Sequence, residues 1–259
     1  MSPGPGRPIL DRFRLDGRVA VITGASSGLG AACALSFAAA GADLVLGARR
    51  AGRLRATAQA ARALGCRALA VATDVTSPGD CDRLVAAGLQ EFERIDVLVN
   101  AAGVASSVPA LREPPDEFRR VVDVNLMGSY WMAQACARVM RPGSSIVNIS
   151  SVIATTTLDA PQAAYTASKA AIEGVTRDLA QQWTGPLGIR VNAVAPGFVM
   201  TELTASAEAY VHRVVEQRSL TGRCAEAIEV AAAILFLASD AASYITGSSL
   251  AVDGGMRVT

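Results

Sequence analysis

Lysine is nearly absent from this sequence. The chain of 259 residues has 24 lysines and arginines, and Lys169 is the only lysine among them. Because arginine occupies every other basic position, position 169 requires something that arginine does not provide. The acidic residues almost balance the basic ones, and the formal net charge is +1. This balance excludes the strongly basic surface that is typical of nucleic-acid-binding proteins.

Cysteine pairs and long apolar runs are missing too. The five cysteines are widely spaced and form no C-x-x-C pair, so we expect no metal site and a reducing cytosolic environment. The longest apolar run, residues 230–238, is less than half the length that spans a bilayer. Residues 1–18 lack the apolar core of a signal peptide. We therefore expect a cytoplasmic protein that has neither nucleic acid nor a membrane as a partner.

Short runs of β-branched residues alternate with longer alanine-rich segments from residue 18 onward. This alternation is typical of βαβ units and predicts a doubly wound α/β fold, with a seven-stranded, mostly parallel sheet and helices on both faces. Most strands are apolar at successive positions, as expected when helices cover both faces. The expected strands are 18–23, 42–47, 66–72, 96–100, 144–150, 189–195 and 248–253. The expected helices are 28–40, 52–64, 78–93, 116–141, 162–183 and 226–238.

One domain accounts for nearly all of the chain. We expect residues 15–259 to form it, and residues 1–14, which are rich in proline and glycine, to be a flexible extension. The one long connection covers about residues 196–224 and follows the carboxyl end of a strand. Ligands bind at such ends in open α/β sheets, so this connection is a candidate substrate loop, with a small helix near 207–218.

The sequence TGASSGLG, residues 23–30, follows the first expected strand and begins the first expected helix. Gly24, Gly28 and Gly30 allow the backbone to turn tightly and to approach a pyrophosphate, whose charge the N–H groups of the helix N-terminus stabilise. Glycine spacing alone is weak evidence, but the strand before it and the helix after it are the context that a dinucleotide site requires. The alternative is an ordinary turn rich in small residues.

The spacing G-x-x-x-G-x-G behind a threonine resembles the short-chain dehydrogenase/reductase family of the classical type. The resemblance covers residues 15 to 255 and implies a Rossmann-type fold and an NAD(P)-dependent oxidoreductase acting on CH–OH groups. At the end of the second strand an acidic residue usually binds the ribose of NAD, whereas an arginine accommodates the 2′-phosphate of NADP. Ala48 and Arg49 stand there, so we expect NADP(H) in preference to NAD(H). The alternative is that Arg49 and Arg50 only begin a solvated helix with Arg53 and Arg55.

Tyr165 and Lys169 are four residues apart in a helical segment, so their side chains project from the same face. A nearby ammonium favours the phenolate, and we therefore expect Lys169 to lower the pKa of Tyr165 from its usual value of about 10. Lysine carries a compact ammonium on a flexible stem, which suits ribose hydroxyls and proton transfer better than a rigid guanidinium does. In the resembled family Y-x-x-x-K supplies the acid–base pair.

The resemblance implies two further catalytic residues and a set of cofactor-binding residues. Ser151, in NISS, would hold the substrate oxygen. Asn125, in DVNLMG, would interrupt a helix and hold a water that links the lysine to solvent. The motifs ATDVT, NAAG and APGFVMTEL match the family after the third, fourth and sixth strands. The implied cofactor-binding residues are Gly24, Ser26, Ser27, Gly28, Leu29, Gly30, Arg49, Asp74, Val75, Asn100, Ala101, Gly103, Tyr165, Lys169, Pro196, Gly197, Val199 and Thr201.

Several substrates and one other class of function stay open. Residues 104–109, 152–158 and 198–215 are expected to face the substrate and are largely apolar, which suggests a fairly apolar secondary alcohol or its ketone. The alternatives are a 3-oxoacyl-(carrier-protein) reductase, which Gln181 and Gln182 disfavour because a basic residue often docks the carrier there, and a sugar-acid or steroid dehydrogenase using NAD(H). A non-catalytic, dinucleotide-sensing protein is the alternative of another class. The family resemblance also implies a homotetramer, with a dimer as the alternative.

Overall fold

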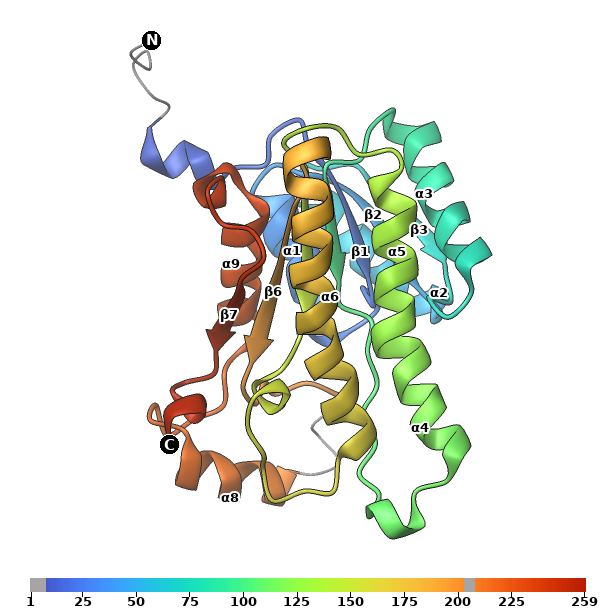
Figure 1. The fold of residues 1–259 in the computed structure, drawn as a ribbon. Helices are drawn as coiled ribbons and strands as arrows, with labels where there is room; N and C mark the ends of the chain where they lie inside the picture. The colour runs from blue at the N-terminus through green and yellow to red at the C-terminus, as the bar shows by residue number, and fades with distance from the viewer. Residues whose placement is uncertain (1–7, 203–207) are drawn as a thin grey trace.

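The computed structural model describes residues 8–202 and 208–259. In this part of the chain seven parallel strands form one sheet between two layers of helices (Figure 1). The strand order is β3-β2-β1-β4-β5-β6-β7, so the chain winds outward in one direction from β1 and in the other from β4. The predicted Rossmann-type, doubly wound fold is confirmed. The strands are β1 (Val19–Thr23), β2 (Asp43–Ala48), β3 (Ala68–Ala72), β4 (Val97–Asn100), β5 (Ser145–Ile149), β6 (Arg190–Pro196) and β7 (Ser249–Val252).

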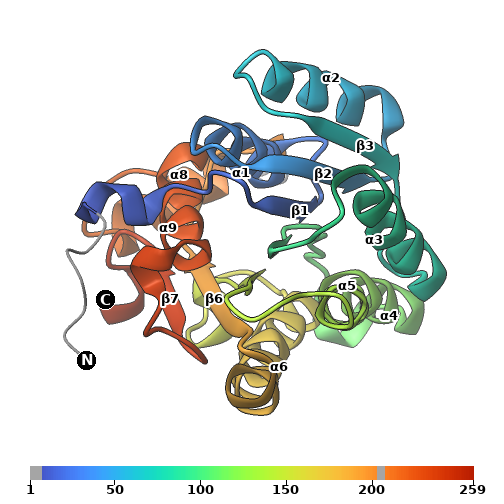
Figure 2. The same ribbon diagram turned by 90° about the horizontal axis from the view of Figure 1, so that it is seen from above.

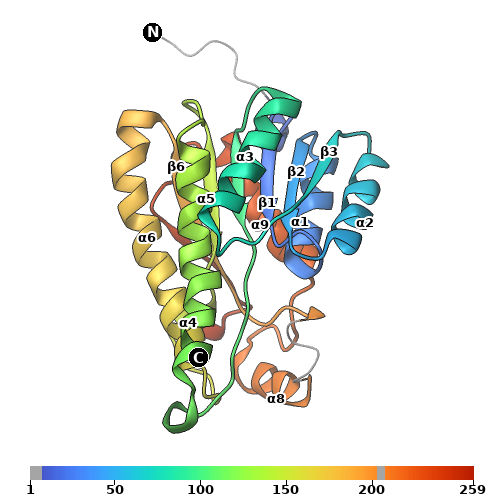
Figure 3. The same ribbon diagram turned by 90° about the vertical axis from the view of Figure 1, so that its right-hand side faces the viewer.

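Helices cover both faces of the sheet, as Figure 2 shows from above. The first face carries α1 (Gly28–Ala39), α2 (Ala51–Arg62) and α9 (Ala227–Ala238). The second face carries α3 (Pro78–Phe92), α4 (Pro115–Val122), α5 (Gly128–Ala137) and α6 (Ala163–Leu187). Helix α8 (Glu208–Arg218) lies apart from both layers, beyond the carboxyl ends of the strands (Figure 3).

The central strands of the sheet are buried on both sides, which explains their continuous apolar runs in the sequence. All five residues of β1 are buried. Ala20 and Ile22 contact the side chains of α1 and α9, whereas Val19 and Val21 contact those of α3 and α5. Each strand of this kind needs apolar residues on both of its faces, and this pattern is what the strand predictions rested on.

The helix expected at 116–141 is interrupted and shorter. Residues Asp123–Met127 form a turn of π-helix between α4 and α5, and α5 ends at Ala137. Pro142 accounts for part of the shortening, because a residue before proline disfavours the helical conformation. Helix α6 runs on to Leu187 instead of ending at 183, and it stops at Gly188, whose φ of +66° is the left-handed conformation that glycine adopts readily.

Parts of two predicted segments lie outside the described residues. They are residues 1–7 of the expected extension and residues 203–207 of the expected substrate loop. Within the extension, Ile9–Phe13 form a turn of 3-10 helix, and the ring of Phe13 lies 5.9 Å from that of Phe236. Within the loop, α8 corresponds to the small helix expected near 207–218.

Gly30 is a position where the fold itself requires glycine. A Cβ atom there would lie 2.5 Å from the carbonyl oxygen of Gly24, and both groups are held by backbone. We expect Gly30→Ala to lower the free energy of unfolding by about 1–3 kcal/mol, the usual cost of overpacking. Urea or thermal unfolding measures this loss. The control is Gly52→Ala on α2, where no atom lies within 4 Å of the new methyl group. Equal stability of the two variants would contradict the packing argument.

Candidate active site

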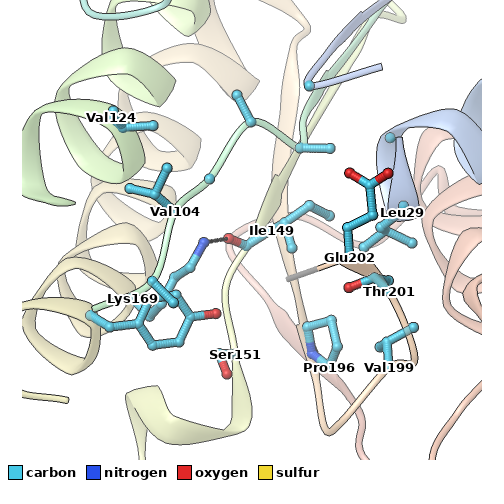
Figure 4. Close-up of a pocket in the computed structure, with 18 of the residues that line it drawn as sticks. Leu29, Val104, Val124, Ile149, Ser151, Lys169, Pro196, Val199, Thr201 and Glu202 are labelled. Carbon is cyan, nitrogen blue, oxygen red and sulfur yellow. Dashed lines mark hydrogen bonds between the residues drawn. The ribbon is translucent and has the colours of Figure 1, made fainter. Parts of the chain in front are cut away.

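A cavity of about 610 Å³ opens at the carboxyl ends of the strands (Figure 4). The segments that follow β1, β2, β3, β4, β5 and β6 all contribute to its wall. It lies where the chain leaves β1 and β4 in opposite directions, which is the usual ligand site of a doubly wound sheet. Its volume is in the range of small-molecule and cofactor sites.

The turn after β1 packs directly against the segment after β4. Gly24 has a φ of +67°, and a Cβ there would lie 2.7 Å from the carbonyl oxygen of Ala101. The hydroxyl of Thr23 accepts hydrogen bonds from the backbone N–H groups of Ala101 (3.1 Å) and Ala102 (3.2 Å). Helix α1 begins after Ser27, and no side chain in the described part of the chain caps this end. The first N–H groups of α1 are therefore available to an anion in the cavity.

A group of charged side chains forms the end of the cavity next to β2. Arg49 is exposed and lines the cavity. Arg50 donates hydrogen bonds to the hydroxyls of Ser26 (3.3 Å) and Ser27, and to the carboxylate of Glu202 (2.9 Å). The sequence prediction included Arg49 but missed Arg50 and Glu202. No pattern in the sequence connects these two residues, because the fold alone brings the segment after β6 to the end of β2.

Lys169 comes from α6, and its ammonium faces the end of β5. The side chain is 5% exposed, and Nζ donates a hydrogen bond to the carbonyl oxygen of Ile149 (2.8 Å). Nζ lies 5.5 Å from the ring centre of Tyr165. The hydroxyl of Ser151, which follows β5, is within hydrogen-bonding reach of Tyr165. The three side chains that the sequence places in separate motifs thus come together in the lining of the cavity, where Figure 4 labels Ser151 and Lys169.

The expected effect of Lys169 on Tyr165 is not what the structure shows. Burial raises the pKa of Tyr165 above its ordinary value, and the hydrogen bond with Ser151 opposes this increase. Burial also lowers the pKa of Lys169, to about 8. The ammonium is engaged by the backbone of β5 and lies over the tyrosine ring, so burial outweighs its effect on the phenol. The prediction that Lys169 lowers the pKa of Tyr165 was wrong for this state of the protein.

Ser150 and Ser151 have different surroundings, although they are adjacent. Ser150 is 1% exposed, and its hydroxyl contacts the backbone carbonyl of Lys169 (3.3 Å) and the carboxylate of Glu173 (3.1 Å). Those contacts tie β5 to α6 below the cavity. Ser151 is the serine whose hydroxyl faces Tyr165, which agrees with the choice made from the sequence.

Asn100 and Asn125 lie behind the cavity wall. The amide of Asn125 accepts from the backbone N–H of Val104 (2.8 Å) and donates to the hydroxyl of Ser168 (3.0 Å), so it fastens the segment after β4 to α6. Its own backbone carbonyl accepts a hydrogen bond from Ser129 (2.7 Å). The expected interruption of the helix at Asn125 is the π-helical turn between α4 and α5. Asn100 donates hydrogen bonds to the backbone carbonyl of Ser129 (3.0 Å) and to the side chain of Asn148 (2.9 Å), and neither Asn100 nor Asn125 lines the cavity.

All other residues predicted for the site line the cavity. They come from every motif that the sequence singled out. They are Gly24, Ser26, Ser27, Gly28, Leu29, Gly30, Arg49, Asp74, Val75, Ala101, Gly103, Ser151, Tyr165, Lys169, Pro196, Gly197, Val199 and Thr201.

Comparison with known proteins identifies the family. The sequence profile described as "Enoyl-(Acyl carrier protein) reductase" matches residues 24–257. The structure resembles a short-chain type dehydrogenase/reductase from Mycobacterium marinum, with a TM-score of 0.93, 34% identity and coverage of 97% of this chain and 100% of the other. The chain belongs to the short-chain dehydrogenase/reductase family.

Two further similarities concern named members of this family. The chain is 42% identical over 253 residues to the galactitol 2-dehydrogenase (L-tagatose-forming) of Cereibacter sphaeroides, covering 95% of this chain and 97% of that one. It also resembles the NADPH-dependent 3-quinuclidinone reductase of Rhodotorula rubra, with a TM-score of 0.92, 31% identity and coverage of 100% and 98%. This short-chain dehydrogenase/reductase is therefore an oxidoreductase that acts on CH–OH groups with an NAD(P) cofactor.

The residues around the cavity fit such a cofactor. The uncapped N-terminus of α1 suits a pyrophosphate, and the guanidinium groups next to β2 suit a further phosphate. Among the described residues no cluster of histidine, cysteine, aspartate or glutamate has the arrangement of a metal site. No helix in the same part of the chain is long and apolar enough to cross a membrane.

Proposed function

We propose that this short-chain dehydrogenase/reductase transfers a hydride between NADP(H) and a secondary alcohol or its ketone, with Tyr165 as general acid and base. The observation that carries the proposal is the meeting of Ser151, Tyr165 and Lys169 in the lining of the cavity. Hydride transfer at a carbonyl carbon requires a proton to reach or leave its oxygen in step. The hydroxyls of Ser151 and Tyr165 face each other and can hold that oxygen between them.

Each side chain of this group has a separate task. When bound, NADP(H) donates or accepts the hydride. In reduction the phenol of Tyr165 gives its proton to the substrate oxygen, and in oxidation the phenolate removes the proton of the hydroxyl. The hydroxyl of Ser151 orients the same oxygen by a hydrogen bond. Lys169 holds its ammonium 5.5 Å from the ring of Tyr165, where its remaining N–H donors can bind the ribose hydroxyls of the cofactor. Asn125 is a positioning residue, because it fixes the segment after β4 against α6.

The preference for NADP(H) rests on Arg49 and on the lack of an acidic residue at the end of β2. The NADPH-dependent reductase among the similar structures supports it. We expect the wild-type protein to bind NADPH more tightly than NADH in a fluorescence titration. We expect Arg49→Ala to weaken NADPH binding about tenfold or more, because charge-assisted bonds to phosphate are strong, and to leave NADH binding unchanged.

A matched control for this variant is Arg55→Ala. Arg55 is exposed on α2, the helix that follows Arg49, and does not line the cavity, so its loss removes one positive charge without removing a cavity contact. We expect it to alter neither affinity. If NADH binds as tightly as NADPH to the wild-type protein, the proposed preference is wrong.

The substrate end of the cavity suits a small molecule. Apolar side chains of Val152, Leu158 and Phe198 lie there together with the amide of Gln162. The name of the similar galactitol dehydrogenase indicates a small, freely diffusing alcohol for that enzyme. We therefore propose a small secondary alcohol in preference to a carrier-bound acyl chain. A panel of polyols, apolar cyclic alcohols and their ketones, followed by NADPH absorbance, tests this. Tight NADPH binding with no turnover of any compound would instead indicate a dinucleotide sensor.

A further inference from the structure

The carboxylate of Glu202, at the mouth of the cavity, pairs with two guanidinium groups. One of its oxygens accepts a hydrogen bond from Arg50 (2.9 Å), and the other pairs with Arg53. Arg50 also contacts the hydroxyls of Ser26 and Ser27 in the turn after β1. Arg50 is therefore held between the phosphate-binding turn on one side and a carboxylate of the same chain on the other.

Glu202 reaches this place because the segment after β6 crosses the N-terminus of α1. A Cβ at Gly28 would lie 3.4 Å from the side chain of Thr201, so this segment rests on the start of the helix. In Figure 4 Glu202 lies next to Leu29, on the side of the cavity away from Lys169. Three segments that are distant in sequence thus meet at one point. Arg50 contacts Ser26, Ser27 and Glu202, and Arg53 shares the carboxylate of Glu202. Of these side chains only Glu202 is negatively charged.

The charges at this end of the cavity affect the affinity for the 2′-phosphate of a bound cofactor. Arg50 follows the end of β2 by two residues, where an arginine accommodates the 2′-phosphate of NADP. A guanidinium that already holds a carboxylate must release it, or accept a second anion next to the first. Either event makes phosphate binding less favourable than at a free guanidinium. Arg50 lowers the pKa of Glu202 below its ordinary value, so this carboxylate is charged throughout the neutral pH range.

We infer that Glu202 is a cofactor-selecting residue, which competes with the 2′-phosphate for Arg50 and Arg53 and thereby weakens the binding of NADP(H) relative to NAD(H). The inference rests on the proposed function, because it assumes that the cofactor lies along this end of the cavity. It predicts that the preference of the wild-type protein for NADPH over NADH is smaller than it would be if Arg50 and Arg53 were not paired with Glu202.

The variant Glu202→Gln tests this inference by direct binding, independently of turnover. Glutamine keeps the size and the hydrogen-bonding oxygen but removes the charge. We expect it to tighten NADPH binding about three- to tenfold, in proportion to the modest strength of partly exposed ion pairs, and to change NADH binding less than about twofold. The increase should diminish at high salt, which screens exposed charges. AMP and its 2′-phosphorylated counterpart, used as fragments, should show the same difference without the nicotinamide half.

Asp116→Asn is the matched control. Asp116 pairs with Arg119 on α4, is almost fully exposed and does not line the cavity, so the control makes the same change in net charge away from the site. It should alter neither affinity. Equal tightening of NADPH and NADH by Glu202→Gln would overturn the inference, as would weaker NADPH binding, which would mean that Glu202 orients Arg50 for the phosphate. Tighter binding of NADH than NADPH by the wild-type protein would overturn the proposed NADP(H) preference itself, a result distinct from both.

Discussion

Replacing Tyr165 with phenylalanine is expected to abolish turnover and to leave cofactor binding nearly unchanged. Phenylalanine keeps the ring next to Lys169 but removes the hydroxyl that faces Ser151. Without it no side chain of the group gives or takes a proton at the substrate oxygen. Loss of a general acid–base residue typically costs a factor of about 10² to 10⁴, so we expect kcat to fall about 10³-fold. Initial rates with NADPH and the best ketone of the panel measure the loss, and fluorescence titration measures NADPH affinity.

Tyr244→Phe is the control for this result. Tyr244 is fully exposed, and its ring lies outside the cavity, so its hydroxyl should contribute nothing to the rate. If Tyr165→Phe kept kcat within about tenfold of the wild-type value, another group would have to supply the proton, and the role proposed for Tyr165 would be refuted.

Lys169→Arg is expected to keep the positive charge and still lose about 10²-fold in kcat, within the range of lost acid–base function. The space around Nζ is limited. The side chain is 5% exposed, and its ammonium donates a hydrogen bond to the carbonyl oxygen of Ile149 (2.8 Å). A planar guanidinium is larger and presents its donors in a fixed fork, so it cannot take the same position without moving its neighbours. Steady-state kinetics measures the loss, and NADPH binding shows whether the variant is folded.

A second variant shows whether a positive charge is needed at this position at all. Lys169→Met has a similar length and no charge. If charge alone matters, Lys169→Arg should retain activity and Lys169→Met should lose it. If the compact ammonium matters, as we expect, both variants lose activity. Wild-type activity in Lys169→Arg would therefore refute the hypothesis that position 169 needs the compact ammonium of lysine.

Much of the fold could be predicted from local patterns. The strands lie within two residues of their expected bounds, because a strand covered on both faces must be apolar throughout, and that requirement is visible in a short window of sequence. The interruption at Asn125 was also foreseeable, since asparagine competes for backbone hydrogen bonds within a helix. The end of α5 at Ala137 and the end of α6 at Leu187 were each misplaced by four residues, although Pro142 and Gly188 are local signals in the sequence for a helix to end near them.

In the candidate site, too, some features could be predicted from the sequence and others could not. Tyr165 and Lys169 could be paired from their spacing on one helix, and Ser151 from its motif. The ion pairs of Glu202 with Arg50 and Arg53 could not, because about 150 residues separate the partners and only the fold brings them together. The pKa of Tyr165 was misjudged for a related reason. A sequence shows that an ammonium is near, but the degree of burial, which dominates here, depends on the packed structure.

The burial of Lys169 also determines how amine chemistry can act on this protein. The side chain carries the only primary amine apart from the chain's amino terminus, and it is 5% exposed in the lining of the cavity. Burial lowers its pKa to about 8, which raises the uncharged, nucleophilic fraction of the amine at any given pH. A reagent selective for amines would therefore have two amines to acylate, and labelling at Lys169 would show whether the reagent enters the cavity.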